Sequence, residues 1–303
     1  MNADRRGLLA GAVATLAAGP ALARMQDTLR LTGSFVQGGH AIGTTWPGAL
    51  VFVDGEALAT ASSEGTFIVG FDRDQTGSVV LEARSGDRAM RRVIDIARVD
   101  FPSTRINGLP AATVTPTDPA LLERIRREVA LKTEGIASRL DADHFRDGFT
   151  WPVTGFRITS RWGSQRILNG TPARPHYGID LAAPQGTPIL APAAGRVTLS
   201  QPDLHFEGGL VLIDHGQGLI TAYLHQSRIM VETGQDLQRG DVIGQVGMTG
   251  RATGPHLHWN VSLNNARVAP PVRICAGAPN GATGISIRRC SFAHSAHARS
   301  FRS

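Results

Sequence analysis

The sequence contains very few cysteines, and both lie close to its C-terminus. Cys275 and Cys290 cannot cross-link the larger part of the chain that precedes them, so a disulfide-stabilised scaffold is excluded for that part. An oxidising compartment would permit a disulfide between the two. No other cysteine or histidine stands beside them at the spacing of a structural zinc site, so they are a weak metal signal.

Lysine is also scarce, since Lys132 is the only lysine among 31 Lys and Arg residues. The net charge of +6 belongs to the ends of the chain. Residues 271–303 contain several arginines and no acidic residue, whereas residues 24–270 are electrically balanced. A nucleic-acid-binding surface needs basic residues clustered on one folded face. The charge distribution therefore argues against nucleic acid as a partner.

Long apolar runs are absent except at the N-terminus. Arg5 and Arg6 precede an apolar stretch, residues 7–23, that ends in the small-residue motif Ala-Leu-Ala. This order predicts a signal peptide at residues 1–23, and the arginine pair is typical of the twin-arginine type; a Sec signal and an uncleaved anchor are the alternatives. We therefore expect an exported protein, periplasmic or associated with the cell envelope, without an integral membrane span after cleavage.

Glycine and proline are plentiful, with 35 and 17 residues, which indicates many turns and a mainly β fold. Residues 25–106 contain short runs of β-branched and aromatic residues separated by Asp-Gly, Glu-Gly, Thr-Gly and Ser-Gly turns. This regular spacing predicts a small β-sandwich-like domain. The runs are residues 29–32, 49–53, 66–69, 78–81 and 93–96.

Residues 107–150 combine a proline-containing linker with one expected helix. Asp118 before Pro119 is a typical helix start. Glycine-punctuated strands return in residues 151–270, and residues 271–303 form a basic, low-order tail. Apolar residues at roughly helical spacing predict one buried face for the helix: Leu121, Leu122, Ile125, Val129, Ile136 and Leu140.

Three histidine-containing segments stand out within residues 151–270. They are residues 176–180 (His-Tyr-Gly-Ile-Asp), 223–225 (Tyr-Leu-His) and 254–259 (Gly-Pro-His-Leu-His-Trp). His256 and His258 are two residues apart, so both side chains would point to the same face of a strand. Gly178 permits a bend that turns His176 and Asp180 toward one point.

These segments contain the groups that metal-assisted hydrolysis requires. Catalytic zinc takes three protein ligands and keeps a further position for water, and imidazole and carboxylate are suitable donors. One histidine, one aspartate and a second histidine would satisfy the metal, which leaves His225 and His256 over. Histidine titrates near neutral pH, so these two are suited to accept a proton from water or to stabilise an oxyanion.

The order of motifs across residues 151–270 resembles peptidase family M23, the LytM/lysostaphin-type peptidoglycan endopeptidases. The resemblance implies an antiparallel β core with zinc in a groove, held by His176, Asp180 and His258. It also implies that His225 and His256 assist the water and polarise the scissile carbonyl. Besides the histidine segments, it includes residues 184–189, 191–197, 213–216, 231–235, 239–241, 243–244 and 247–250.

Three further residues are expected to line the substrate groove. Tyr223 adjoins one of the histidine segments, and Arg166 and Asn169 lie in the loop that precedes His176. Each is therefore placed near the predicted metal by its position in the sequence.

The function implied by the resemblance is zinc-dependent hydrolysis of the peptide stems of peptidoglycan, in D-alanine–diaminopimelate cross-links or in glycine bridges. The alternative is a non-catalytic M23-like protein that activates other cell-wall hydrolases, which would then be its partners. Loss of ligands marks such regulators, and all five positions here carry the expected residue. The domain at residues 25–106 is expected either to position the enzyme on the wall or to cover its groove.

Overall fold

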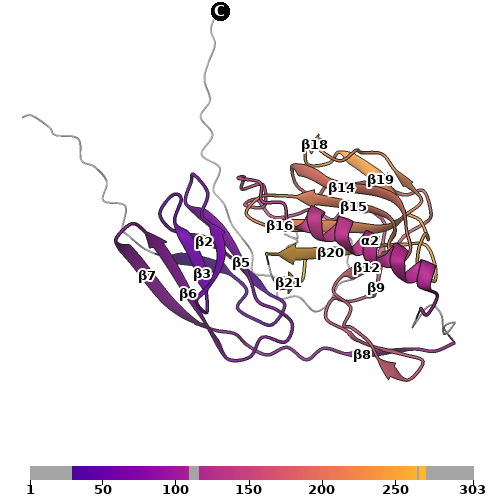
Figure 1. Cartoon of the computed structure of the whole chain (residues 1–303), viewed down its shortest axis with the longest axis horizontal. Coiled ribbons are helices and arrows are strands. Elements are labelled where there is room, and N and C mark those ends of the chain that lie inside the picture. The colour runs from indigo at the N-terminus through magenta and orange to yellow at the C-terminus, as the bar shows by residue number, and fades with distance from the viewer. Residues whose placement is uncertain (1–28, 109–115, 265, 271–303) are drawn as a thin grey trace, which may run out of the picture.

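The computed structural model describes residues 29–108, 116–264 and 266–270 (Figure 1). This part of the chain is mainly β, as expected, and contains one helix, α2 (Pro119–Ile136). None of its helices is both long and apolar enough to cross a bilayer. The predicted signal peptide, the C-terminal residues with the two cysteines and part of the proline-containing linker lie outside the described residues.

Two antiparallel sheets face each other in the N-terminal region, with strand orders β1-β2-β5 and β4-β3-β6-β7. Phe67 from one sheet and Leu81 from the other are fully buried in their shared apolar core, as a β-sandwich requires. The strands are β1 (Arg30–Gly33), β2 (His40–Thr44), β3 (Leu50–Val53), β4 (Glu56–Thr60), β5 (Thr66–Gly70), β6 (Ser78–Ser85) and β7 (Arg88–Asp95). Each of the five predicted runs overlaps a strand, but β2 and β4 were not predicted.

A larger sheet dominates the C-terminal region, in the order β18-β14-β15-β16-β20-β12-β9, with β21 paired to β20. Its described pairs are antiparallel. The strands are β9 (Arg157–Ser160), β12 (Ile179–Ala182), β14 (Gly195–Leu204), β15 (Gly208–Asp214), β16 (Leu219–Gln226), β18 (Asp236–Leu237), β20 (His256–Leu263) and β21 (Ala266–Val268).

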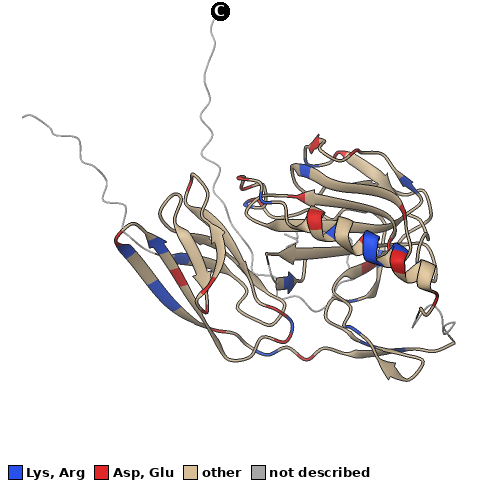
Figure 2. Cartoon of the chain, viewed as in Figure 1, with Lys and Arg blue, Asp and Glu red and all other residues tan. Residues whose placement is uncertain are grey.

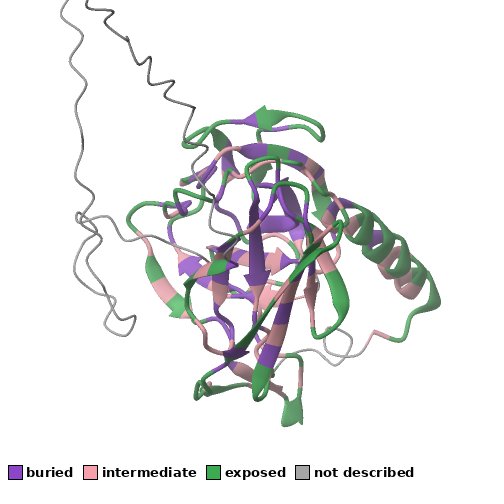
Figure 3. Ribbon diagram, turned by 90° about the vertical axis from the view of Figure 1, so that its left-hand side faces the viewer, coloured by how far each residue is buried: buried purple, intermediate pink, exposed green. Residues whose placement is uncertain are grey.

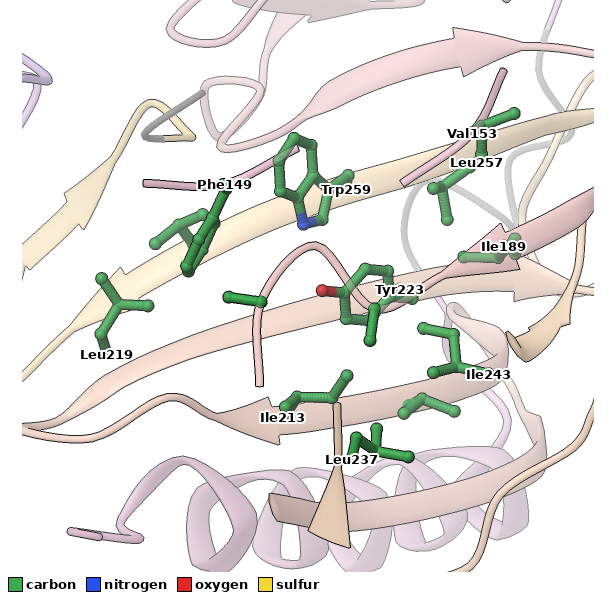
Figure 4. Packing of buried hydrophobic residues seen from close by; sticks show 14 of the residues in the cluster. Phe149, Val153, Ile189, Ile213, Leu219, Tyr223, Leu237, Ile243, Leu257 and Trp259 are labelled. Atoms are coloured by element: carbon green, nitrogen blue, oxygen red, sulfur yellow. The ribbon is translucent and has the colours of Figure 1, made fainter. Parts of the chain in front are cut away.

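A small sheet, β13-β19-β17, contributes to the same apolar core. Its strands are β13 (Pro188–Leu190), β17 (Arg228–Ile229) and β19 (Val242–Gln245). Trp259 on β20 and Tyr223 on β16 are register partners, and Figure 4 shows both rings among the apolar side chains of this core. Strands β15 and β16 are buried along almost their whole length, and buried residues gather toward the middle of the molecule (Figure 3).

Helix α2 begins where the sequence predicts, because the Asp118 side chain accepts a hydrogen bond from the Leu121 backbone N–H at 2.8 Å. Its packing differs from the prediction. Val129, expected on the buried face, is 49% exposed, whereas Glu128 and Gly135 are buried. Acidic and basic residues lie side by side along the helix (Figure 2). The helix therefore docks on the large sheet through a polar residue and a glycine as well as through apolar side chains.

The N-terminal sandwich and the larger sheet are in direct contact. Strand β5 is buried on both faces, with Phe67 in the sandwich core and Ile68 in the core of the large sheet. A second connection is the sheet β11-β10-β8, in which the pairing of β8 with β10 is parallel. Its strands are β8 (Ser103–Ile106), β10 (Gln165–Leu168) and β11 (Thr171–Pro172).

Candidate metal centre

Pairing of β12 with β20 brings two of the predicted ligands together, since Asp180 is the register partner of His258. His176 lies in the loop just before β12. The Asp180 Oδ1 atom is 2.8 Å from His258 Nδ1 and 3.0 Å from His176 Nε2, and the two histidine nitrogens are 3.0 Å apart. The three side chains therefore converge on one point, as the sequence predicted.

The ring of His176 is fixed by its second nitrogen. Nδ1 lies 3.1 Å from the Arg161 carbonyl oxygen and 2.8 Å from Ser160 Oγ. A carbonyl oxygen only accepts, so Nδ1 carries the hydrogen and Nε2 presents its lone pair to Asp180 and His258. A backbone partner of this kind fixes the tautomer and orientation of a metal-binding histidine.

His225 and His256 lie beside these ligands and are held in the same way. Nδ1 of His225 is 2.8 Å from the Thr249 carbonyl oxygen, and Nδ1 of His256 is 2.8 Å from that of Gly254. Each ring therefore keeps Nε2 free of hydrogen. The two ring centroids are 4.8 Å apart, and His256 Nε2 is 3.8 Å from Asp180 Oδ1. All five predicted metal and catalytic residues thus form one cluster.

Burial sets the charges of this cluster. It lowers the pKa of His225 to about 3 and also lowers the pKa of His258, so both imidazoles are neutral near pH 7. Burial alone would raise the pKa of Asp180, but the close approach of the His176 and His258 rings outweighs it and holds that pKa below its ordinary value. The cluster accordingly presents one carboxylate and, at His225 and His258, two neutral imidazoles.

This donor set fits a divalent metal. His176, Asp180 and His258 each offer one ligand atom, and these atoms lie within 4.8 Å of one another. Donors about 2 Å from one tetrahedral ion lie roughly 3.3 Å apart, close to the observed spacing. Lone pairs directed at one another across such short distances repel, and a cation between them would remove that repulsion. Two imidazoles and a carboxylate are the ligand types of catalytic zinc sites.

Arg166 on β10 lies at the edge of the cluster, where its Nη2 is 3.4 Å from Asp180 Oδ2. Asn169 lies at the exposed tip between β10 and β11, with φ +47°. The structure therefore brings Arg166 into contact with a predicted ligand.

Tyr223 does not line a groove, and this prediction was wrong. Its side chain is fully buried, and its hydroxyl accepts a hydrogen bond from Thr221 Oγ1 at 2.9 Å. Residues two apart in a regular strand share a face, so the side chain of Tyr223 would be expected on the same face of β16 as that of His225. The backbone of His225, however, has φ +65° and breaks this alternation. Left-handed φ in a non-glycine residue is a strained conformation that recurs at functional sites.

Sequence reasoning missed the residues that hold the histidines through their main chains. These are Arg161, Thr249 and Gly254, whose carbonyl groups fix the rings of His176, His225 and His256. A main-chain carbonyl exists at every position, so residue type gave no signal for them.

Comparison with known proteins agrees with this arrangement. Residues 174–270 match the family model of peptidase family M23. A crystal structure described as "putative peptidase M23" from Pseudomonas aeruginosa is 35% identical, with a TM-score of 0.62 over 78% of this chain and 93% of that one. The chain therefore belongs to peptidase family M23.

Curated relatives match over a shorter stretch. Peptidoglycan DD-endopeptidase ShyA from Vibrio cholerae is 41% identical over 120 residues, which is 39% of this chain and 28% of ShyA. An "Uncharacterized metalloprotease" from Haemophilus influenzae is 38% identical over 110 residues, 36% of this chain and 23% of that protein. The match thus spans about a quarter of each relative. The family and the second name imply a metal.

Proposed function

We propose that this protein is a zinc-dependent endopeptidase that hydrolyses peptide cross-links of bacterial peptidoglycan outside the cytoplasm. The observation that carries the proposal is the convergence of His176, Asp180 and His258 beside the imidazoles of two further histidines, His225 and His256. Relatives named peptidoglycan DD-endopeptidases support the substrate class. They make the D-alanine–diaminopimelate cross-link the first substrate to test.

His176, Asp180 and His258 would hold the metal. Two nitrogen donors favour zinc over magnesium or calcium, which prefer oxygen ligands throughout. When bound, zinc supplies Lewis-acid chemistry that polarises a carbonyl group and makes water a nucleophile near neutral pH.

We assign the proton transfers to His225 and His256. Each donates Nδ1–H to a main-chain carbonyl group, so each Nε2 is available as an acceptor. A neutral imidazole takes a proton from the attacking water and, once protonated, stabilises the oxyanion or protonates the leaving amine. Two such rings beside the metal ligands allow one to act as base while the other acts on the carbonyl oxygen. A regulator that does not catalyse hydrolysis would not require all three metal-binding residues and both further histidines.

The proposal is tested with protein lacking residues 1–23, incubated with isolated peptidoglycan. Released peptides are identified by mass spectrometry, with and without a chelator and after zinc is restored. Cleavage should stop with the chelator, return with zinc and be abolished in the His258→Ala variant. His205→Ala is the matched control, because His205 stacks on Phe206 and is not part of the cluster. Cleavage that continues in the chelator would exclude the metal mechanism.

A further inference from the structure

Arg166 lies next to the metal cluster and has more N–H donors than the one that contacts it. Its side chain is 29% exposed and makes one described contact, the 3.4 Å approach of Nη2 to Asp180 Oδ2. A guanidinium group has five N–H donors. Asp180 directs its other oxygen, Oδ1, toward His176 and His258. Arg166 therefore lies on the outer side of the carboxylate, with donors left for a ligand.

Arg251 lies in the loop whose carbonyl groups orient two histidines of the cluster. Its backbone N–H donates to the Phe206 carbonyl oxygen at 2.9 Å, and its guanidinium group stacks 4.6 Å from the centroid of the Phe206 ring. Thr249 and Gly254, which fix His225 and His256, belong to the same loop. The loop that orients the two catalytic histidines thus also carries Arg251.

The charges of the two arginines act on each other. Burial lowers the pKa of Arg251, and the positive charge of Arg166 lowers it further while Glu207 opposes the shift. Glu207 is already paired with Lys132 at 2.5 Å, and the charge of Asp180 would be offset by the metal. Positive charge therefore exceeds negative charge on this rim, which favours an anionic ligand.

We propose that Arg166 and Arg251 together bind a carboxylate group of the peptide substrate beside the scissile bond. This inference rests on the proposed function. In a D-alanine–diaminopimelate cross-link, the leaving amine is borne by a carbon that also carries a carboxylate, so that anion reaches the metal cluster together with the scissile bond. Guanidinium groups bind carboxylates through paired N–H donors, which gives direction as well as charge.

The test compares two cross-linked muropeptide dimers that differ only in this carboxylate, which is free in one and amidated in the other. For the zinc-loaded protein, kcat/KM is measured on both, and affinity for both is measured on the His256→Ala variant. The free carboxylate should be preferred by about tenfold or more, mainly through KM. Arg251→Gln and Arg166→Gln should each reduce this preference, and the double variant should abolish it.

Matched measurements separate recognition from folding and metal binding. Arg196→Gln removes an exposed arginine that pairs with Asp236, and it should keep the full preference. Zinc content is measured for Arg166→Gln, because Arg166 touches Asp180. Arg251→Lys should recover part of the preference through its charge.

Two outcomes would overturn the proposal. One is equal kcat/KM of the wild type on both dimers, and the other is a variant that slows both dimers by the same factor. Failure to cleave either dimer would refute the proposed peptidase function instead. The affinities measured on the His256→Ala variant would then still test the roles of Arg166 and Arg251. Equal affinity for the two dimers would overturn the proposed carboxylate site.

Discussion

The backbone at Gly178 lies against the ring of His258. A Cβ atom at this position would be 2.4 Å from His258 Nε2 and 3.0 Å from the Trp259 carbonyl oxygen. Gly178→Ala should therefore displace His258 or the backbone beside it, and zinc affinity should fall about tenfold or more, the size of effect that loss of support around a metal ligand produces. Competition with a chromogenic chelator measures that affinity.

Gly234→Ala is the control for this variant. Gly234 has φ +90° and no atom within 4 Å of the added Cβ. The substitution strains the backbone and should cost about 1 kcal/mol of unfolding free energy without changing zinc affinity. If Gly178→Ala bound zinc as tightly as the wild type, close contact between Gly178 and His258 would not matter for the site.

His40, on β2, makes the stability of the metal-free protein depend on pH. Burial lowers the pKa of its folded-state imidazole to about 4 from the ordinary value of 6.5. Between these values the unfolded chain binds the proton first, so stability is full above pH 6.5 and falls as pH drops toward 4. His40→Gln should reduce the loss of unfolding free energy between pH 7 and 5 by about 1–2 kcal/mol. Urea unfolding at both pH values measures this, and an unaltered loss would contradict it.

Helix α2 is anchored by a buried carboxylate. Glu128 accepts hydrogen bonds from the His205 backbone N–H at 3.0 Å and from Arg124 Nε at 2.7 Å. Glu128→Ala should cost about 1–3 kcal/mol of unfolding free energy, because the part-buried backbone N–H of His205 loses its partner. Glu134→Ala, on the exposed side of the same helix, should cost much less. Equal shifts of the melting temperature in the two variants would contradict the role of Glu128 as an anchor of helix α2.

Elements with a strong local signal were predicted, and those shaped by tertiary contacts were not. The helix start followed from Asp118 and Pro119. Its buried face did not, because Gly135 packs against Leu212 and Leu199 and periodicity counts apolar residues only. Strand β2 escaped prediction because it contains alanine and glycine. Gly43 belongs there because the ring of Phe67 fills the space that a side chain would occupy.

The residues of the cluster could be predicted because three histidine-containing segments occur in an order that resembles peptidase family M23. His258 was expected on the same face of a strand as His256, and both occupy that face of β20. Tyr223 was misplaced because the left-handed backbone of His225 interrupts the alternation. Arg251 was missed because nothing in the sequence relates its loop to β10.

At the scale of the whole molecule, we propose that residues 25–106 support the peptidase domain at residues 151–270 and do not cover its groove. Gly70 on β5 lies so close to Val268 and Ala266 that a Cβ atom would clash with them. The Ala269 backbone N–H donates to the Gly38 carbonyl oxygen at 2.8 Å. Two regions that share strand β5 and such close contacts should unfold together.

Arg73 is the residue through which this support reaches the metal cluster. Its Nε donates to the Gly163 carbonyl oxygen at 2.7 Å, and its guanidinium group stacks on Phe101 at 4.7 Å. The Gly163 backbone N–H donates in turn to the His176 carbonyl oxygen at 2.7 Å. Arg73 therefore holds the loop that orients His176 from a different part of the chain.

Arg73→Gln should loosen this loop and lower zinc affinity about tenfold, together with activity on peptidoglycan. Arg91→Gln, on the exposed edge strand β7, is the control and should change neither. The competing hypothesis, in which residues 25–106 cover the groove, predicts the opposite sign, since weakening the contact would then raise activity. Zinc competition and cleavage rates for the two variants decide between them. If Arg73→Gln raised the activity and left zinc affinity unchanged, residues 25–106 would be shown to cover the groove. The hypothesis that they support the peptidase domain would then be refuted.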